Sequence, residues 1–146
     1  MAHQRAAIRA AVMAALNGKT TAEGRVYEHA LDPLPSEARP ALVVRTGDET
    51  AEPLAMGRDL RTIPLAIEAH ARGKTPAALE AALDALAEEV ETAMDALGPT
   101  FDGLVLGVQY QGTSITRSAE GEQGADGVAT LGYEVQYEAR AFGVPA

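Results

Sequence analysis

The residues of this chain that could form a nucleotide site lack the partners that such a site needs. Gly18-Lys19-Thr20 imitates the end of a phosphate-binding loop. The full motif has another glycine five residues before Gly18, where this chain has Met13, and it follows a strand. Here a predicted helix comes first. We therefore expect a turn that ends a helix.

Three histidines are candidates for metal ligation or for acid–base catalysis: His3, His29 and His70. His3 lies near the N-terminus, and the other two lie on different predicted strands without a second ligand four residues away. A histidine beside a glutamate in a strand points away from it, so we expect no pairing with Glu28 or Glu68. The sequence predicts no metal site.

Nucleophilic catalysis also finds little support. The chain has no cysteine, which excludes a disulfide scaffold, a thiolate zinc site and a cysteine nucleophile. No serine stands in a Gly-x-Ser-x-Gly turn, and Ser114 and Ser118 fall in a predicted loop. Carboxylates are so numerous that no acid–base pair stands out. We expect a protein that is not an enzyme and that uses no cofactor.

Length and charge narrow the class of protein further. The 146 residues suit a single domain covering 1–146. Twelve basic and 21 acidic side chains give a formal charge of -9, which argues against sequence-independent nucleic-acid binding and against docking on anionic membranes. No apolar run is long enough to span a membrane, and the N-terminus does not read as a signal peptide.

Two amphipathic helices are expected to position the rest of the chain. The first covers about residues 3–17 and ends at Asn17-Gly18. The second opens at Thr75-Pro76, continues to Leu97 and ends at Gly98-Pro99. Its polar side carries six acids and no base: Glu80, Asp84, Glu88, Glu89, Glu91 and Asp95.

Five strands are predicted from runs of apolar and alternating residues, over 25–30, 41–46, 60–71, 104–111 and 128–142. Pro64 favours an edge position or a site that faces out of the sheet, because proline cannot donate to a neighbouring strand. Long connections over 47–59 and 112–127 are expected to be functional or mobile. The order of elements predicts an α+β fold: a mostly antiparallel mixed sheet packed by two helices on one face.

Two surface features leave alternatives open. The acidic side of the second helix is either a solvated face or an electrostatic surface that meets a basic partner or repels a polyanion. Leu54 and Met56, in the acidic loop 47–59, either contact a partner or fold back on the sheet.

The ordered succession of segments resembles the tail terminator family of long-tailed bacteriophages, the lambda-like minor tail protein U family. The resemblance covers nearly the whole chain, although no single motif is diagnostic. It is carried by Ile8-Arg9-Ala10-Ala11-Val12, Arg25-Val26-Tyr27, Arg39-Pro40-Ala41-Leu42-Val43-Val44, Thr46-Gly47-Asp48-Glu49, residues 63–68 and 75–97, Gln109-Tyr110 and residues 129–138.

The resemblance implies a structural protein with a fold related to that of tail tube subunits. Family members form a homohexameric ring that caps the tail tube, stops its polymerisation and provides the surface for head–tail joining. The implied partners are the chain itself, the tail tube protein and a head-completion or connector protein. DNA passes through the ring without specific binding. The implied location is the virion tail, assembled in the host cytoplasm.

The resemblance also implies roles for particular residues. We expect the loop after the second strand to face the tail tube, through Asp48, Glu49, Leu54, Met56 and Arg58. Contacts between subunits are expected at the sheet edges and at three arginines that can pair with acids of the next copy: Arg25, Arg45 and Arg61.

Two other interpretations of the protein's function remain. The chain could be another neck or tail-completion protein, or a terminator-like part of a gene-transfer or contractile particle. It could also be a small α+β enzyme or ligand-binding domain, which requires a deep pocket with convergent polar groups and a perturbed pKa.

Overall fold

The computed structural model describes residues 3–28, 39–118 and 124–143. The described residues form two helices, α1 (Gln4–Leu16) and α2 (Pro76–Leu97). The strands are β1 (Val26–Glu28), β2 (Ala41–Thr46), β3 (Thr50–Pro53), β4 (Arg58–Gly73), β5 (Gly107–Arg117) and β6 (Ala125–Arg140). This arrangement confirms the predicted α+β class.

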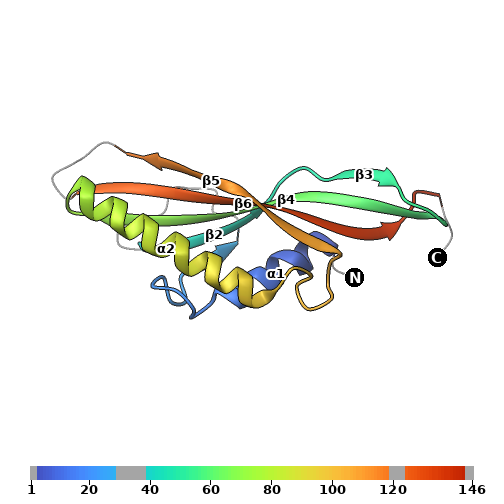
Figure 1. Ribbon diagram of the computed structural model, residues 1–146, viewed down its shortest axis with the longest axis horizontal. Coiled ribbons are helices and arrows are strands. Elements are labelled where there is room, and N and C mark those ends of the chain that lie inside the picture. The colour runs from blue at the N-terminus through green and yellow to red at the C-terminus, as the bar shows by residue number, and fades with distance from the viewer. Residues whose placement is uncertain (1–2, 29–38, 119–123, 144–146) are drawn as a thin grey trace.

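The described strands form one mixed sheet in the order β1-β2-β4-β6-β5, and β3 also pairs with β4. β1 runs parallel to β2, whereas the other pairs are antiparallel. β4 and β6 form the centre of the sheet and pair over their whole length, from Arg58 opposite Arg140 to Gly73 opposite Ala125. A single pair of strands therefore connects the two ends of the molecule (Figure 1).

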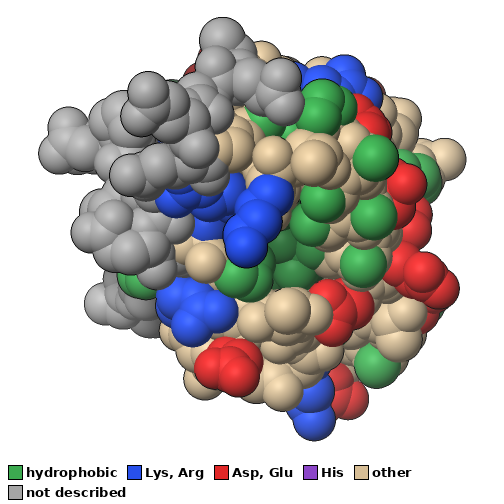
Figure 2. All heavy atoms as spheres, turned by 90° about the vertical axis from the view of Figure 1, so that its left-hand side faces the viewer, with side chains coloured by type: hydrophobic (Ala, Val, Ile, Leu, Met, Phe, Trp, Pro, Cys, Tyr) green, Lys and Arg blue, Asp and Glu red, His purple; other side chains and the backbone are tan. Residues whose placement is uncertain are grey.

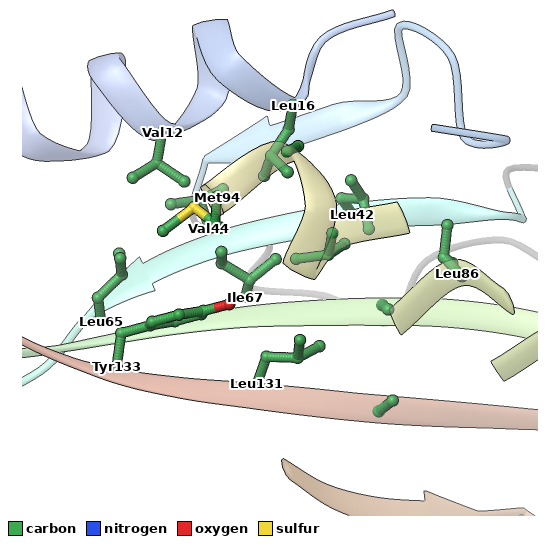
Figure 3. Packing of buried hydrophobic residues seen from close by; sticks show 14 of the residues in the cluster. Val12, Leu16, Leu42, Val44, Leu65, Ile67, Leu86, Met94, Leu131 and Tyr133 are labelled. Atoms are coloured by element: carbon green, nitrogen blue, oxygen red, sulfur yellow. The ribbon is translucent and has the colours of Figure 1, made fainter. Parts of the chain in front are cut away.

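Both helices cover the same face of the sheet, and the core lies between them and the strands. Alternate residues of β4 and β6 face the helices because side chains in a strand alternate between the two sides. Figure 3 shows Val12 of α1 and Met94 of α2 above Val44, Ile67 and neighbouring side chains of the sheet. The predicted inward residues of β6 are buried at Leu131, Tyr133, Val135 and Tyr137.

The helices begin and end where their capping residues predict. The Thr75 side chain accepts a hydrogen bond from the Ala78 amide at 3.1 Å, and Pro76 takes the first helical position. After α1, Gly18 has a φ of 74° and its amide donates to the Glu23 carbonyl at 2.8 Å. Gly18-Lys19-Thr20 is thus part of the turn that ends α1, as predicted.

Of the two positions predicted for Pro64, the edge strand is wrong, because β4 lies between β2 and β6, whereas the Pro64 side chain is exposed, as the other alternative requires. It is tolerated where β2 has ended at Thr46 and β3 has not yet begun. There the Pro64 carbonyl accepts from the Gly47 amide at 2.9 Å. A Cβ atom on residue 47 would lie 2.8 Å from the Pro64 ring, so glycine at 47 makes room for the proline.

The two long connections are shorter than the sequence predicts. Residues 47–59 contain β3 and the first two residues of β4, joined by a tight turn. Of residues 112–127, the described part continues β5 to Arg117 and begins β6 at Ala125. β5 starts at Gly107, so residues 104–106 precede the strand that we expected to include them. The predicted strand residues 29 and 30 and the connection 31–38 lie outside the described residues.

One end of the sheet extends past the helices. β3, the start of β4 and the end of β6 form a projection on the right of Figure 1, opposite the end where α2 begins. We call residues 50–62 and 136–142 the arm. The arm replaces the mobile loop predicted over residues 47–59.

Candidate functional site

The arm ends in a tight turn with an unusual backbone. Met56 has a φ of 54° and Gly57 a φ of 74°, so two consecutive residues are left-handed. The Arg58 amide donates to the Ala55 carbonyl at 3.0 Å, and the Leu54 amide donates to the Arg58 carbonyl at 3.0 Å. Such turns match the twist of a hairpin, but they favour glycine, asparagine or aspartate over methionine.

Three large apolar side chains are exposed around this turn. Leu54 is 47% exposed, Met56 97% and Phe142 102%. The Ala141 amide donates to the Gly57 carbonyl at 2.9 Å, which brings the chain next to Phe142 alongside the turn. The structure does not fold Leu54 and Met56 back on the sheet. We call Leu54, Met56 and Phe142 the arm tip.

Phe142 was missed as a site residue, because it follows the last strand in the sequence and lies far from Leu54 and Met56. The signal that points to it is register. When β6 pairs with β4 over its whole length, the residues after Arg140 must reach the turn that precedes Arg58. The register between β4 and β6 cannot be derived from the sequence alone.

Two arginines face each other beside the arm tip. Arg58 and Arg140 are direct partners in the β4–β6 pairing. Arg58 lies 3.9 Å from the Glu138 carboxylate, and both of these side chains are partly exposed. Among the described residues Arg140 forms no ion pair. Like charges in directly opposed positions disfavour the pairing of two strands.

The arm joins the rest of the molecule at a small polar cluster. Arg61 Nη1 lies 3.1 Å from Glu49 Oε2, and the Tyr137 hydroxyl donates to Glu49 Oε1. Burial alone raises the pKa of Glu49, but the hydrogen bonds from Tyr137 and Arg61 and the charge of Arg61 outweigh it, so this pKa is lowered. Burial and the bond to Glu49 raise the pKa of Tyr137 to about 12. These shifts favour a charged Glu49 and a neutral Tyr137.

The other residues expected in contacts have intrachain partners or open positions. Asp48 is exposed between β2 and β3. Arg45 lies 2.9 Å from the Glu68 carboxylate, and Arg25 donates to the Pro40 carbonyl at 2.7 Å. With Arg61 bound to Glu49, all three arginines expected between subunits already have partners in their own chain.

A groove with a volume of about 710 Å³ runs between the C-terminal parts of α1 and α2. Small side chains leave this space: Ala15 lies on one helix and Ala85, Ala93 and Ala96 on the other. Lys19, Glu88, Glu89, Thr92 and Leu97 complete the lining. We call it the helix groove. The sequence missed it because it depends on how two separate helices meet.

Tyr110 and Tyr133 border a smaller cavity on the opposite side of α2. Their ring centroids lie 5.5 Å apart, and the cavity of about 180 Å³ is also lined by Met94 and Phe101. Burial raises the pKa of Tyr133 to about 12, and the negative charges of Glu91 and Asp95 add to the effect. Burial in this cavity therefore favours the protonated form of Tyr133.

The expectation that His70 points away from Glu68 is wrong. The two residues are separated by one position in β4, so they share a face, and His70 Nε2 lies 3.0 Å from Glu68 Oε1. His3 caps α1 by accepting from the Arg5 amide, and His29 lies outside the described residues. No cluster of three metal-ligating side chains occurs in the described part of the chain.

Charge is unevenly distributed over the surface. Seen from the end opposite the arm, many acidic side chains lie along the right-hand side, several Lys and Arg side chains gather near the middle, and others lie beside acids at the top and bottom (Figure 2). None of the described helices is long and apolar enough to cross a membrane.

Comparison of the sequence with models of known protein families gives no match, and no curated protein matches it significantly. The functional argument therefore depends on the residues and surfaces described above.

Proposed function

We propose that this chain is a tail terminator of a long-tailed phage, a structural subunit that forms a hexameric ring, caps the tail tube and stops its growth. The observation that carries the proposal is the arm, which ends in Leu54, Met56 and Phe142 exposed together. Apolar side chains gathered on the surface of a small protein mark contacts with other proteins. The resemblance of the sequence to the terminator family gives that contact its context.

A ring made of identical subunits needs two different surfaces on each subunit, because its contacts are head-to-tail. The arm tip and the helix groove are two such surfaces, and they lie on different parts of the molecule. A subunit with these two surfaces meets the minimum requirement for assembly into a ring.

The acidic surface suits a ring through which DNA passes. Proteins that hold DNA without sequence preference neutralise its phosphates with lysine and arginine, whereas this chain has a formal charge of -9. An acidic lumen keeps the polyanion from binding. The proposal places the tail tube protein and a head-completion or connector protein on the two open sides of the ring, within the virion tail.

The experiment that tests this function is electron microscopy of tails assembled without the protein. We expect tubes of uncontrolled length, and we expect that adding the purified protein restores uniform length. Tails of normal length would rule out termination. Normal tails that fail to join heads would instead identify another neck or tail-completion protein.

A further inference from the structure

We propose that the arm tip of one copy docks into the helix groove of a second copy. The contact concerns two copies of this chain alone, so it does not require that they cap a tail tube. Three observations carry it: the apolar character of both surfaces, their opposite charges, and the unfavourable state of the tip in a single copy.

The two surfaces share an apolar character, and the groove has room for large side chains. The tip presents Leu54, Met56 and Phe142, and the groove is lined largely by alanines and Leu97. A volume of about 710 Å³ lies within the range of about 300 to 1,000 Å³ of pockets that bury ligands of considerable size. Methionine is flexible and polarisable, so it fits irregular apolar grooves well.

The charges around the two surfaces are complementary. Arg58 and Arg140 flank the tip, with Glu138 3.9 Å from Arg58, whereas Glu88 and Glu89 border the groove, whose lining also includes Lys19. Glu91 and Asp95 extend the acidic surface along α2, and they line a neighbouring hollow together with Glu88. Docking therefore brings two arginines toward several carboxylates, which orients the partners and disfavours other arrangements.

Docking also relieves two unfavourable features of the single copy. Arg58 and Arg140 repel each other across the β4–β6 pair, and Glu138, 3.9 Å from Arg58, offsets this repulsion only in part. Nearby carboxylates of another copy compensate the remainder. Met56 is 97% exposed in a left-handed conformation, so it gains neither burial nor backbone relaxation when the chain is alone. A second copy supplies the burial.

The contact is head-to-tail, because each copy donates its arm tip to one neighbour and offers its helix groove to another. A repeated contact of this kind closes into a ring or continues as an open chain, depending on the rotation between copies. The arm then lies across α1 and α2 of the next copy.

Engineered cysteines test the contact directly, because the natural chain has none. One variant carries Met56→Cys at the tip and a second carries Ala96→Cys in the groove. Mixed and oxidised at equal concentration, the two should form a mixed disulfide at least about tenfold faster than Met56→Cys mixed with the control Ser114→Cys. Ser114 is an exposed residue of β5, outside both surfaces.

Equal rates with Ala96→Cys and Ser114→Cys would overturn the proposal. Faster formation of the disulfide with Ala96→Cys, in the absence of any tube protein, supports it. Cross-linking of the tip only to added tube protein would assign the tip to the tube and overturn docking between copies. None of these results depends on tail length, so a failure of the proposed function is recognised separately.

A charge exchange gives an independent test by sedimentation of the intact chain. Arg58→Glu combined with Arg140→Glu makes the tip acidic, and Glu88→Arg makes the groove border more basic. Each variant alone should associate about tenfold more weakly than the natural chain. A mixture of the two should recover association, because every tip then meets a groove of opposite charge.

We expect both variants to fold, because all three substituted positions are exposed. A cooperative thermal unfolding transition checks that each variant is folded. If both variants associate as the natural chain does, or if their mixture stays dissociated while both are folded, the tip does not occupy the groove.

Discussion

Met56 combines a disfavoured backbone with an exposed side chain. A left-handed conformation costs a residue with a Cβ atom about 1 to 2 kcal/mol, and asparagine tolerates it better than methionine. The side chain recovers none of this cost in the single copy, because it is 97% exposed. Methionine at this position therefore reduces the stability of the monomer and enlarges the apolar tip.

Met56→Asn should separate these two effects. We expect the free energy of unfolding to rise by about 0.5 to 1 kcal/mol, because asparagine adopts a left-handed φ more readily. We also expect weaker association, because the apolar side chain is lost. Denaturant unfolding and sedimentation measure the two effects. Ala55→Asn is the matched control in the same turn. A stabilised variant that associates normally would contradict a role for the Met56 side chain.

Tyr137 in the polar cluster at the base of the arm and Tyr133 in the cavity beside α2 predict a loss of stability in alkali. Tyr137 and Tyr133 each have a pKa raised from 10.0 to about 12 in the folded protein. The unfolded chain ionises first, so the contribution of these two tyrosines to the free energy of unfolding should be constant below about pH 10 and fall as the pH rises toward 12. Denaturant unfolding at several pH values measures the slope.

Tyr137→Phe should make that alkaline slope shallower and should lower stability near pH 7 by about 1 to 2 kcal/mol, because a hydrogen bond to the charged Glu49 is lost. Tyr27→Phe, at an exposed position of β1, is the control and should change neither quantity. An unchanged slope in Tyr137→Phe would show that Tyr137 does not contribute to the pH dependence.

At the level of elements, close approach between α2 and β4 fixes the position of the helix. A Cβ atom on residue 73 would lie 2.3 Å from the Leu79 amide nitrogen, in the first turn of α2. Gly73→Ala should therefore lower the free energy of unfolding by about 2 to 3 kcal/mol, as expected for overpacking against a rigid backbone. Calorimetry or denaturant unfolding measures the change.

Gly107→Ala is the control for this substitution, since no atom lies within 4 Å of an added Cβ on β5. We expect its stability to be unchanged or slightly higher, because alanine restricts the unfolded chain. If Gly73→Ala is as stable as Gly107→Ala, then α2 can move away from the sheet without lowering the free energy of unfolding.

The elements with strong local signals are the ones that the sequence predicts well. α2 has a capping threonine, a proline in its first turn and a glycine at its end, and its predicted bounds match the structure. β2 is a buried run of apolar residues and also matches. β3 is exposed at all four positions, so it lacks the apolar alternation that distinguishes a strand from a loop. Its pairing with β4 alone makes it a strand.

The candidate site was predictable only in part, for the same reason. Leu54 and Met56 stood out as apolar residues in a polar segment. Phe142 and the helix groove arise from contacts between segments far apart in the chain, and one sequence does not specify such contacts. The position of Pro64 also depended on its surroundings: the interruption between β2 and β3 makes an inner proline acceptable.

At the level of the whole molecule, net charge should govern association. Every added copy brings a charge of -9, and this repulsion acts over a screening length of about 30 Å at 0.01 M salt but only about 8 Å at 0.15 M. Contacts between Arg58 or Arg140 and the groove acids act over a few ångströms and are screened less. We therefore expect association to increase between these two salt concentrations.

Sedimentation at a fixed protein concentration measures this dependence. The Arg58→Glu and Arg140→Glu double variant is the control, and it should remain weakly associated at both salt concentrations because its tip no longer complements the groove. A natural chain that dissociates steadily as salt rises over this range would show that attraction between charges, and not net repulsion, dominates assembly.

The uninterrupted pairing of β4 with β6 also has a mechanical consequence. The two strands pair over 16 positions, about 50 Å at the usual rise per residue, and the arm is their far end. A force on the arm along the strands pulls in shear, so it loads many hydrogen bonds together instead of opening them one at a time. The arm is thus stiff along its length, and a force applied at Met56 is transmitted to the part of the β4–β6 pair that lies beneath α2.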